Sequence, residues 1–212
     1  MTDRYGVGEG PSVAEARTRR QAALAGHAGE EGVARRLLDH PSAPVRATAL
    51  GALARLGLAR AHDVARGVSD PEPLARRRAC EVAAAVDGVD LVPLLADDDA
   101  SVVEAAAWAL GERGQGGPEV LAALAATAVG HSDALCRESA VAALGAIGHP
   151  AGLPAILAAT VDKPAVRRRA VIALAPFEGP EVRAALGRAL DDRDWQVRQA
   201  AEDLLAEDGR TQ

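Results

Sequence analysis

Three glutamates are the side chains of this sequence best placed to perform acid–base or metal chemistry. Glu104 and Glu138 occupy the same position in two successive copies of a repeated segment, and Glu81 lies one copy earlier. Carboxylates that face each other from neighbouring helices could share a proton or bind a cation. Arg77 and Arg168 flank them in the same pattern and would neutralise their charge. We therefore predict no catalytic residue, no metal site and no cofactor.

Histidine and cysteine offer no alternative centre. Cys80 is predicted on an exposed helix face beside Arg76 and Arg77, which would lower the pKa of its thiol. A catalytic thiol also needs a histidine base, and none is placed for it. The five histidines fall in predicted turns or helix ends, and none is followed by glutamate: His27, His40, His62, His131 and His149. Cys80 and Cys136 lie two copies apart, too far for a disulfide, which fits a reducing, cytoplasmic location.

The glutamates, the arginines and the two cysteines belong to a segment that recurs with spacings of 27 to 34 residues. Apolar or small residues at positions one, five, eight and nine of each copy lie on one face of a helix. A second helix is predicted before each copy, ending at Gly57, Gly114, Gly148 or Gly179 as a left-handed cap. The copies read VRATALGAL from Val45, ARRRACEVA from Ala75, VVEAAAWAL from Val102, CRESAVAAL from Cys136, VRRRAVIAL from Val166 and VRQAAEDLL from Val197, with a weaker ARTRRQAAL from Ala16.

The composition favours closely packed helices. Apolar residues make up 49% of the 212 residues, but aromatic residues only 2%. A core of small side chains requires helix axes to approach closely. Ala, Leu, Arg and Glu are strong helix formers, and no β-branched run of strand length occurs. The predicted fold class is therefore all-α.

An acidic turn followed by V-R-x-x-A-x-x-A-L resembles the HEAT repeat, and most closely the bacterial subgroup named after phycobilisome lyases. The resemblance covers residues 13–206 and implies a single α-α superhelix, an α-solenoid of about seven helical hairpins. Residues 1–12 and 207–212 are predicted to be flexible tails. The sequence departs from the pattern twice, since Val103 replaces the usual arginine and Pro176 shortens the sixth copy.

Position two of the copies is the most regular polar feature. Its arginines are predicted to form a structural ladder in which each one pairs with the aspartates and carbonyls of the turns, rather than an anion-binding site. The members of the ladder are Arg46, Arg76, Arg137, Arg167 and Arg198. Trp195 is predicted to cover the end of the stack.

Positions three, six, seven and ten are predicted to point away from the core and to line the concave groove of the superhelix. Exposed apolar and aromatic side chains on such a surface mark contact sites. The predicted partner-binding residues are Arg77, Glu81, Glu104, Trp108, Glu138, Val141, Arg168 and Ile172.

The main hypothesis is a non-enzymatic scaffold, monomeric, whose groove binds a partner protein or peptide. The net charge of −6 disfavours nucleic acid as a partner, and no stretch of about 18 apolar residues predicts a membrane span. The resemblance leaves an alternative, an accessory protein of the phycobilin-lyase type that acts on a cofactor-bearing protein. A DNA-binding or glycosylase-like HEAT protein is a third hypothesis, but the expected basic surface and aromatic cleft are missing.

Overall fold

A computed structural model describes residues 12–208 of the chain. This part contains twelve α-helices and two 3₁₀ helices and no β-strand, which confirms the predicted all-α class. The elements are α1 (Val13–Ala28), α2 (Glu31–Leu37), α3 (Ala43–Arg55), α4 (Ala61–Val68), α5 (Pro73–Ala83), η1 (Val92–Ala96), α6 (Ala100–Arg113), α7 (Pro118–Gly130), α8 (Ala134–Ile147), η2 (Pro150–Gly152), α9 (Leu153–Ala159), α10 (Pro164–Ala173), α11 (Pro180–Leu190) and α12 (Trp195–Asp208).

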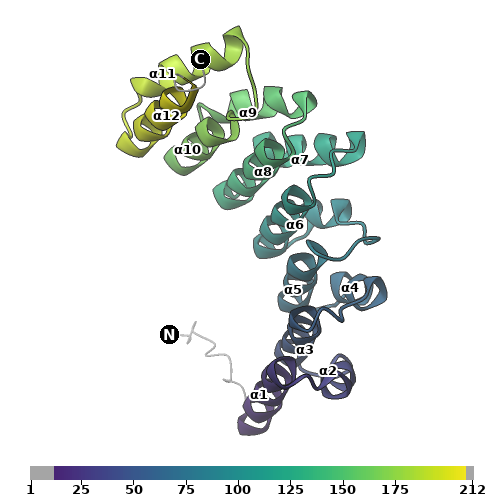
Figure 1. Cartoon of the computed structure of the whole chain (residues 1–212). Helices are drawn as coiled ribbons and strands as arrows, with labels where there is room; N and C mark the ends of the chain where they lie inside the picture. Colours follow the sequence, from purple (N-terminus) through teal and green to yellow (C-terminus); the bar gives the residue numbers. More distant parts are fainter. Residues whose placement is uncertain (1–11, 209–212) are drawn as a thin grey trace, which may run out of the picture. The chain divides into compact units, whose positions relative to one another are not determined.

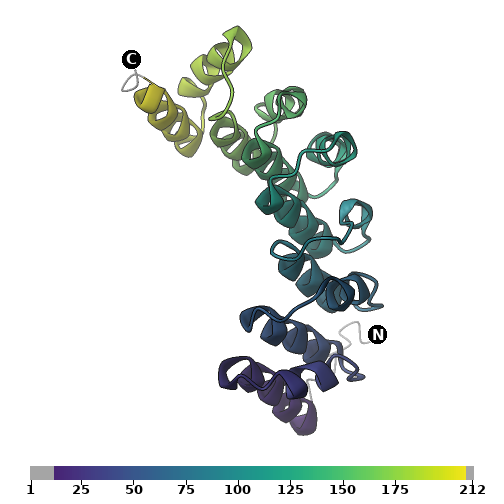
Figure 2. The same cartoon turned by 45° about the vertical axis from the view of Figure 1, so that its right-hand side comes forward.

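The described residues group into two compact units, one up to Val82 and one from Ala83 onward. In the second unit, α6, α8, α10 and α12 lie side by side in one row, and η1, α7, α9 and α11 form a second row behind them (Figures 1 and 2). In the first unit, α1 packs on α3 in the same way, with α2 and α4 on the other side. The tails predicted at 1–12 and 207–212 lie outside the described residues, except for Ser12, which caps α1, and the last two residues of α12. One continuous domain over 13–206 stays a prediction.

Each copy of the repeated segment forms a helix, and the element before it is shorter. Seven repeated helices alternate with six partner elements in residues 12–208. The partner element around Leu91, Leu94 and Leu95 is only a five-residue 3₁₀ helix, η1, and Gly88 turns the chain before it at φ +83°. Arg113 secures the irregular segment before it, donating to the carbonyls of Ala83, Val86 and Val89 at 2.9, 3.1 and 2.7 Å.

The predicted glycine caps belong to the other helix of each pair. Gly57, Gly114 and Gly148 have φ values of +64° to +69°, but they follow the repeated helices α3, α6 and α8. Gly179 begins α11 as its N-cap instead of ending a helix. The prediction that these glycines end the second helix was wrong. A left-handed glycine ends the helix that directly precedes it, and the helices that precede Gly57, Gly114 and Gly148 are the repeated ones.

Close helix contacts also correct the register of the first copy. A Cβ on Gly26 would lie 2.9 Å from the Cα of Ala52, and a Cβ on Gly111 would lie 2.9 Å from the Cα of Ala143. Since Gly111 is position ten of its copy, Gly26 holds the same position in α1. The first copy therefore begins at Arg17 and not at Ala16, and its position two is Thr18.

The arginine ladder runs through the turns. Arg167 donates two hydrogen bonds to the carboxylate of Asp192, from Nε at 2.8 Å and from Nη2 at 2.7 Å. Its Nη1 also donates to the carbonyl of Asp162 at 2.8 Å. Arg137 binds Asp162 in the same bidentate way, at 2.6 and 2.7 Å, as Arg46 binds Asp70, at 2.7 and 2.7 Å. The two remaining members donate to turn carbonyls, Arg76 to those of Asp70 and Pro71 and Arg198 to that of Asp192. The three bidentate pairs thus tie α3, α8 and α10 to the turn of the next copy.

The break in the ladder at Val103 has a structural counterpart. Where the turns after α4 and α11 place an aspartate, Asp70 and Asp192, the turn after α7 places His131, whose Nδ1 accepts from the Asp133 N–H at 3.0 Å. The turn after α2 likewise places His40, which accepts from the Ser42 N–H at 3.1 Å. Asp192 uses its Oδ1 in the same way, accepting from Asp194 at 2.8 Å. A histidine can hold the turn but offers no second carboxylate oxygen, so an arginine at position 103 would lack its bidentate partner. Val103 is fully buried instead.

Candidate functional site

Helices α6, α8, α10 and α12 expose one edge of the second unit, and the predicted contact residues at positions three and seven lie on it. Trp108 and Ile172, both at position seven, are each 45% exposed. At position three, Glu104 is exposed, and Glu138 and Arg168 are half-buried.

Position six, by contrast, belongs to the core. Val141 and Cys80 are fully buried, and Val171 is only 1% exposed. The predictions that Val141 lines the groove and that Cys80 is exposed were wrong. On a helix of 3.6 residues per turn, position six lies on the same side as positions two and nine, which face the neighbouring helices. Large side chains there are covered on both sides.

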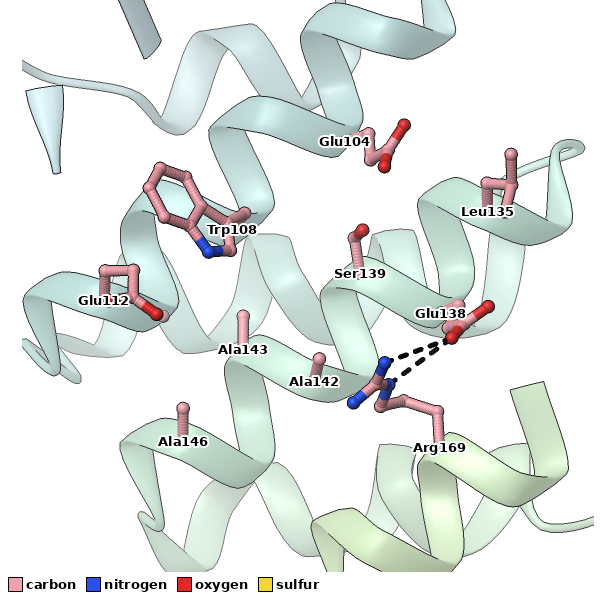
Figure 3. A pocket seen from close by; sticks show the side chains of 11 residues that line it. Glu104, Trp108, Glu112, Leu135, Glu138, Ser139, Ala142, Ala143, Ala146 and Arg169 are labelled. Carbon is pink, nitrogen blue, oxygen red and sulfur yellow. Dashed lines mark hydrogen bonds and ion pairs between the residues drawn. The ribbon is translucent and has the colours of Figure 1, made fainter. Parts of the chain in front are cut away.

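The first hollow of this edge lies between α6 and α8 and has a volume of about 470 Å³. Figure 3 shows Trp108 and Glu112 on one side of it and Leu135 and Glu138 on the other. Small side chains form its floor, which is why space remains between two closely packed helices. The lining residues are Glu104, Trp108, Gly111, Glu112, Leu135, Glu138, Ser139, Ala142, Ala143, Ala146 and Arg169.

Glu138 is neutralised by a different arginine from the one predicted. Arg169 of α10 donates to Glu138 Oε1 from Nε at 3.4 Å and from Nη2 at 3.3 Å (Figure 3). Arg168, the predicted partner, faces the next hollow. Position four of α10, Arg169, points toward α8, the preceding repeated helix, whereas position three, Arg168, does not. The sequence alone could not indicate Arg169, because it does not show which side of each repeated helix packs on the preceding one.

The second hollow lies between α10 and α12 and also has a volume of about 470 Å³. Arg168 and Ile172 line it together with Trp195 and Leu204. Trp195 is 64% exposed and lies on the side of α12 that faces α10, the preceding repeated helix. The prediction that it covers the end of the stack was therefore wrong. Trp195 stands at the first turn of α12, where an indole can lie over the preceding repeat only by leaving most of its surface in solvent.

Arg77 and Glu81 belong to the first unit and bind each other. Arg77 Nε donates to Glu81 Oε1 at 3.1 Å, and Arg78 also contacts Glu81. These residues line a hollow of about 230 Å³ with Arg19, Thr48 and Leu74. The two predicted residues are therefore close together, and their part in partner binding stays a prediction.

Neither cysteine is reactive by position. Both are fully buried and neither is in a disulfide, and the Cys136 S–H donates to the carbonyl of Ala100 at 3.3 Å. Burial raises the pKa of the Cys136 thiol to about 11, with smaller contributions from the charges of Asp133 and Glu104.

Within residues 12–208, no group of three or more His, Cys, Asp or Glu side chains is arranged to hold a metal ion. No helix of the same residues has the length and apolar character required to span a membrane.

Helical pairs stacked in register, with a carboxylate–arginine ladder in their turns, define a repeat protein of the armadillo and HEAT class. The family model described as HEAT repeats matches residues 64–144, 88–175 and 126–206, and the chain belongs to this family. The match does not separate the phycobilisome-lyase subgroup, which stays a prediction. No curated protein matches the chain.

Several solved structures share the fold. The Escherichia coli protein YibA is 18% identical, with a TM-score of 0.60 over 95% of this chain and 75% of that one. An engineered protein is 20% identical, with a TM-score of 0.61 over 94% of this chain and 65% of that one. A designed armadillo repeat protein, solved in complex with the peptide (KR)4, is 17% identical, with a TM-score of 0.51 over 93% and 95%. At these identities the likeness is one of fold.

Several residues that line the two hollows were not predicted from the sequence, among them Glu112, Leu135, Arg169 and Trp195. Glu112 could have been found, because it continues the line of Glu104 and Trp108 along the helix at intervals of four residues. Leu135 and Trp195 lie before position one of their copies, outside the segment that was aligned. Only the packed row shows that the first turn of each helix contributes to the same edge.

Proposed function

We propose that this chain is a non-enzymatic binding module that holds a segment of a partner protein against the second unit. The binding surface, called here the tryptophan face, consists of Glu104, Trp108, Glu138, Arg168, Ile172 and Trp195. One observation carries the proposal: both tryptophans of the chain are exposed, Trp108 to 45% and Trp195 to 64%, and each lines a hollow on the same edge of the row.

Exposed tryptophans of this kind favour binding over a structural role. An indole buries a large apolar area when a partner covers it, and tryptophan is enriched among residues that dominate binding energy. Neither Trp108 nor Trp195 belongs to the buried core, so the fold does not require either ring. The hollows beside them give a partner side chain a place to enter instead of a flat surface to cover.

The two hollows differ in character, which supports recognition of an extended segment with unlike side chains. The hollow beside Trp108 contains several carboxylates. The hollow beside Trp195 is lined by Ile172, Leu204 and alanines. Its one carboxylate, Asp203, accepts a hydrogen bond from Gln199 Nε2 at 2.8 Å. An apolar side chain suits the second hollow. The designed armadillo protein bound to (KR)4 supports the idea that stacked helical repeats can hold an extended peptide.

Tryptophan fluorescence tests the proposal directly, because Trp108 and Trp195 are the only tryptophans and both report on this face. Peptides selected by display on the purified protein should change its emission on titration. The double variant Trp108→Ala/Trp195→Ala should lose the selected peptides, measured by anisotropy of labelled peptide. The matched control, Val129→Ala/Val161→Ala, removes two side chains that are 58% and 81% exposed outside the face and should bind normally.

Two results would contradict the proposal. Selected peptides could bind without any change in tryptophan emission, or the control variant could lose them as completely as the double tryptophan variant. Circular dichroism of each variant separates loss of binding from loss of fold. Replacing the two valines should change the free energy of unfolding by less than about 0.5 kcal/mol. Replacing Trp108, which is only 45% exposed, should cost about 1–3 kcal/mol for the apolar area that it buries.

A further inference from the structure

We infer that the hollow beside Trp108 receives the cationic side chain of an arginine or lysine in the partner segment. This inference rests on the proposed function and names the chemistry of its first hollow. It is carried by a charge imbalance around an exposed indole, which the second hollow does not share.

Three carboxylates and one guanidinium line the hollow. Glu138 forms an ion pair with Arg169, whose Nη2 lies 3.3 Å from Glu138 Oε1. Among the residues that the structure describes, Glu104 and Glu112 form no ion pair. The hollow therefore presents two uncompensated negative charges, and a cation is the ligand that would compensate them.

The positions of these charges relative to the ring make the match more specific. Glu104, Trp108 and Glu112 follow one another at intervals of four residues and lie along one line of α6 (Figure 3). A guanidinium or ammonium group placed over the face of Trp108 would have a carboxylate available on either side. Attraction of a cation to an indole contributes about 0.5–1 kcal/mol at an exposed site and about 2 kcal/mol when water is excluded.

The floor of the hollow admits a long side chain. Ala142, Ala143 and Ala146 of α8 line it opposite Trp108, and their methyl groups would contact the aliphatic stem of an arginine or lysine. An acidic side chain would meet Glu104 and Glu112 and be repelled. The second hollow lacks this imbalance, because Arg168 and Asp203 line it together.

The test uses the variant Trp195→Phe, in which Trp108 is the only tryptophan and hence the only source of tryptophan emission. The probes are hexa-arginine amide, its neutral isostere hexa-citrulline amide and hexa-glutamate amide. Hexa-arginine should change the Trp108 emission with saturation, and the other two peptides should not. Glu104→Gln/Glu112→Gln, in the same background, should weaken hexa-arginine binding by about ten-fold, equivalent to about 1.4 kcal/mol.

The matched control is Glu119→Gln/Glu181→Gln, which removes the same net charge from exposed positions on α7 and α11. It should change hexa-arginine binding by less than about two-fold, since surface charges far from the ligand are screened by salt. The inference is overturned if this control weakens binding as much as Glu104→Gln/Glu112→Gln, or if hexa-citrulline binds as well as hexa-arginine. Either result would mean that the peptide responds to overall charge or to shape.

Failure of this inference and failure of the proposed function give different results. If display selection yields peptides that change the emission of Trp108 but carry no arginine or lysine, the tryptophan face binds partners and the cationic specificity is wrong. If no peptide class changes the emission of either tryptophan, both proposals are wrong.

Discussion

Gly145 of α8 lies directly against Ala173 of α10. A Cβ on Gly145 would be 2.6 Å from the Cβ of Ala173 and 2.8 Å from its Cα, closer than carbon atoms pack. Two repeated helices can therefore approach each other only because one has no side chain at this point and the other has a methyl group. The same contact joins Gly111 to Ala143 one copy earlier. In a chain with only 2% aromatic residues, the core depends on such contacts to exclude voids.

Gly145→Ala should therefore destabilise the protein despite the higher helix propensity of alanine. Overpacking a closely packed contact costs about 1–3 kcal/mol, which exceeds the gain of about 0.5–1 kcal/mol from replacing glycine inside a helix. Urea unfolding followed by circular dichroism measures the difference.

Gly187→Ala is the matched control. Gly187 lies inside α11, and a Cβ there would meet no atom within 4 Å. This variant should gain about 0.4–1 kcal/mol. If both variants shift stability in the same direction, the close contact of Gly145 does not set the helix spacing.

The ladder pair Arg167–Asp192 should make stability depend on pH. The hydrogen bonds from Arg167 hold the pKa of Asp192 below its ordinary value, against the opposing effect of burial. A lowered pKa in the folded state stabilises the fold above the unfolded value of about 3.9, and this stabilisation is lost as pH falls through the folded pKa. Arg167→Met should cost about 1.5–3 kcal/mol at pH 7, and the deficit should shrink below about pH 4.

Urea titrations at pH 7 and pH 3 provide the measurement. Arg183→Met is the control, because Arg183 is an exposed arginine on α11 and its loss should stay within about 0.5 kcal/mol at both values. A deficit for Arg167→Met that is the same at both pH values would show that lost packing of the arginine stem, and not the ion pair, carries its contribution.

The missing ladder position can be installed. Val103→Arg alone should destabilise the protein, because it places a charge at a fully buried position without a partner. Adding His131→Asp supplies the carboxylate at the place that Asp162 and Asp192 hold in other turns. The double variant should recover a coupling energy of about 1–3 kcal/mol, measured by a double-mutant cycle. Additive effects would contradict the equivalence of these turns.

Native thiols should resist modification. Cys136 is fully buried and its pKa is raised to about 11, so at pH 8 it is protonated as well as covered. Ellman's reagent should react with neither cysteine of the folded protein and with both in concentrated urea. An introduced cysteine at exposed Ala126 should react at once in the folded state. Fast native reaction of Cys136 would require local opening of α8.

The sequence by itself determined the periodic features of this protein. Spacings of 27 to 34 residues between copies and apolar residues at fixed positions predicted the repeated helices, because helix periodicity is a local property. Pro176 predicted the early end of α10, which stops at Ala173, because proline cannot continue a helix. Trp108, Glu104 and Ile172 were found for the same reason, since their exposure follows from the face on which they lie.

Only the tertiary structure decided how neighbouring copies meet. Val141 is buried and Arg169, not Arg168, reaches Glu138, because the direction in which each helix packs on the next is not encoded in its own periodicity. Trp195 and Leu135 join the same edge through the first turns of their helices. The hollow beside Trp108 exists because alanines of α8 stand opposite a tryptophan of α6, a juxtaposition that requires the two helices to be packed together.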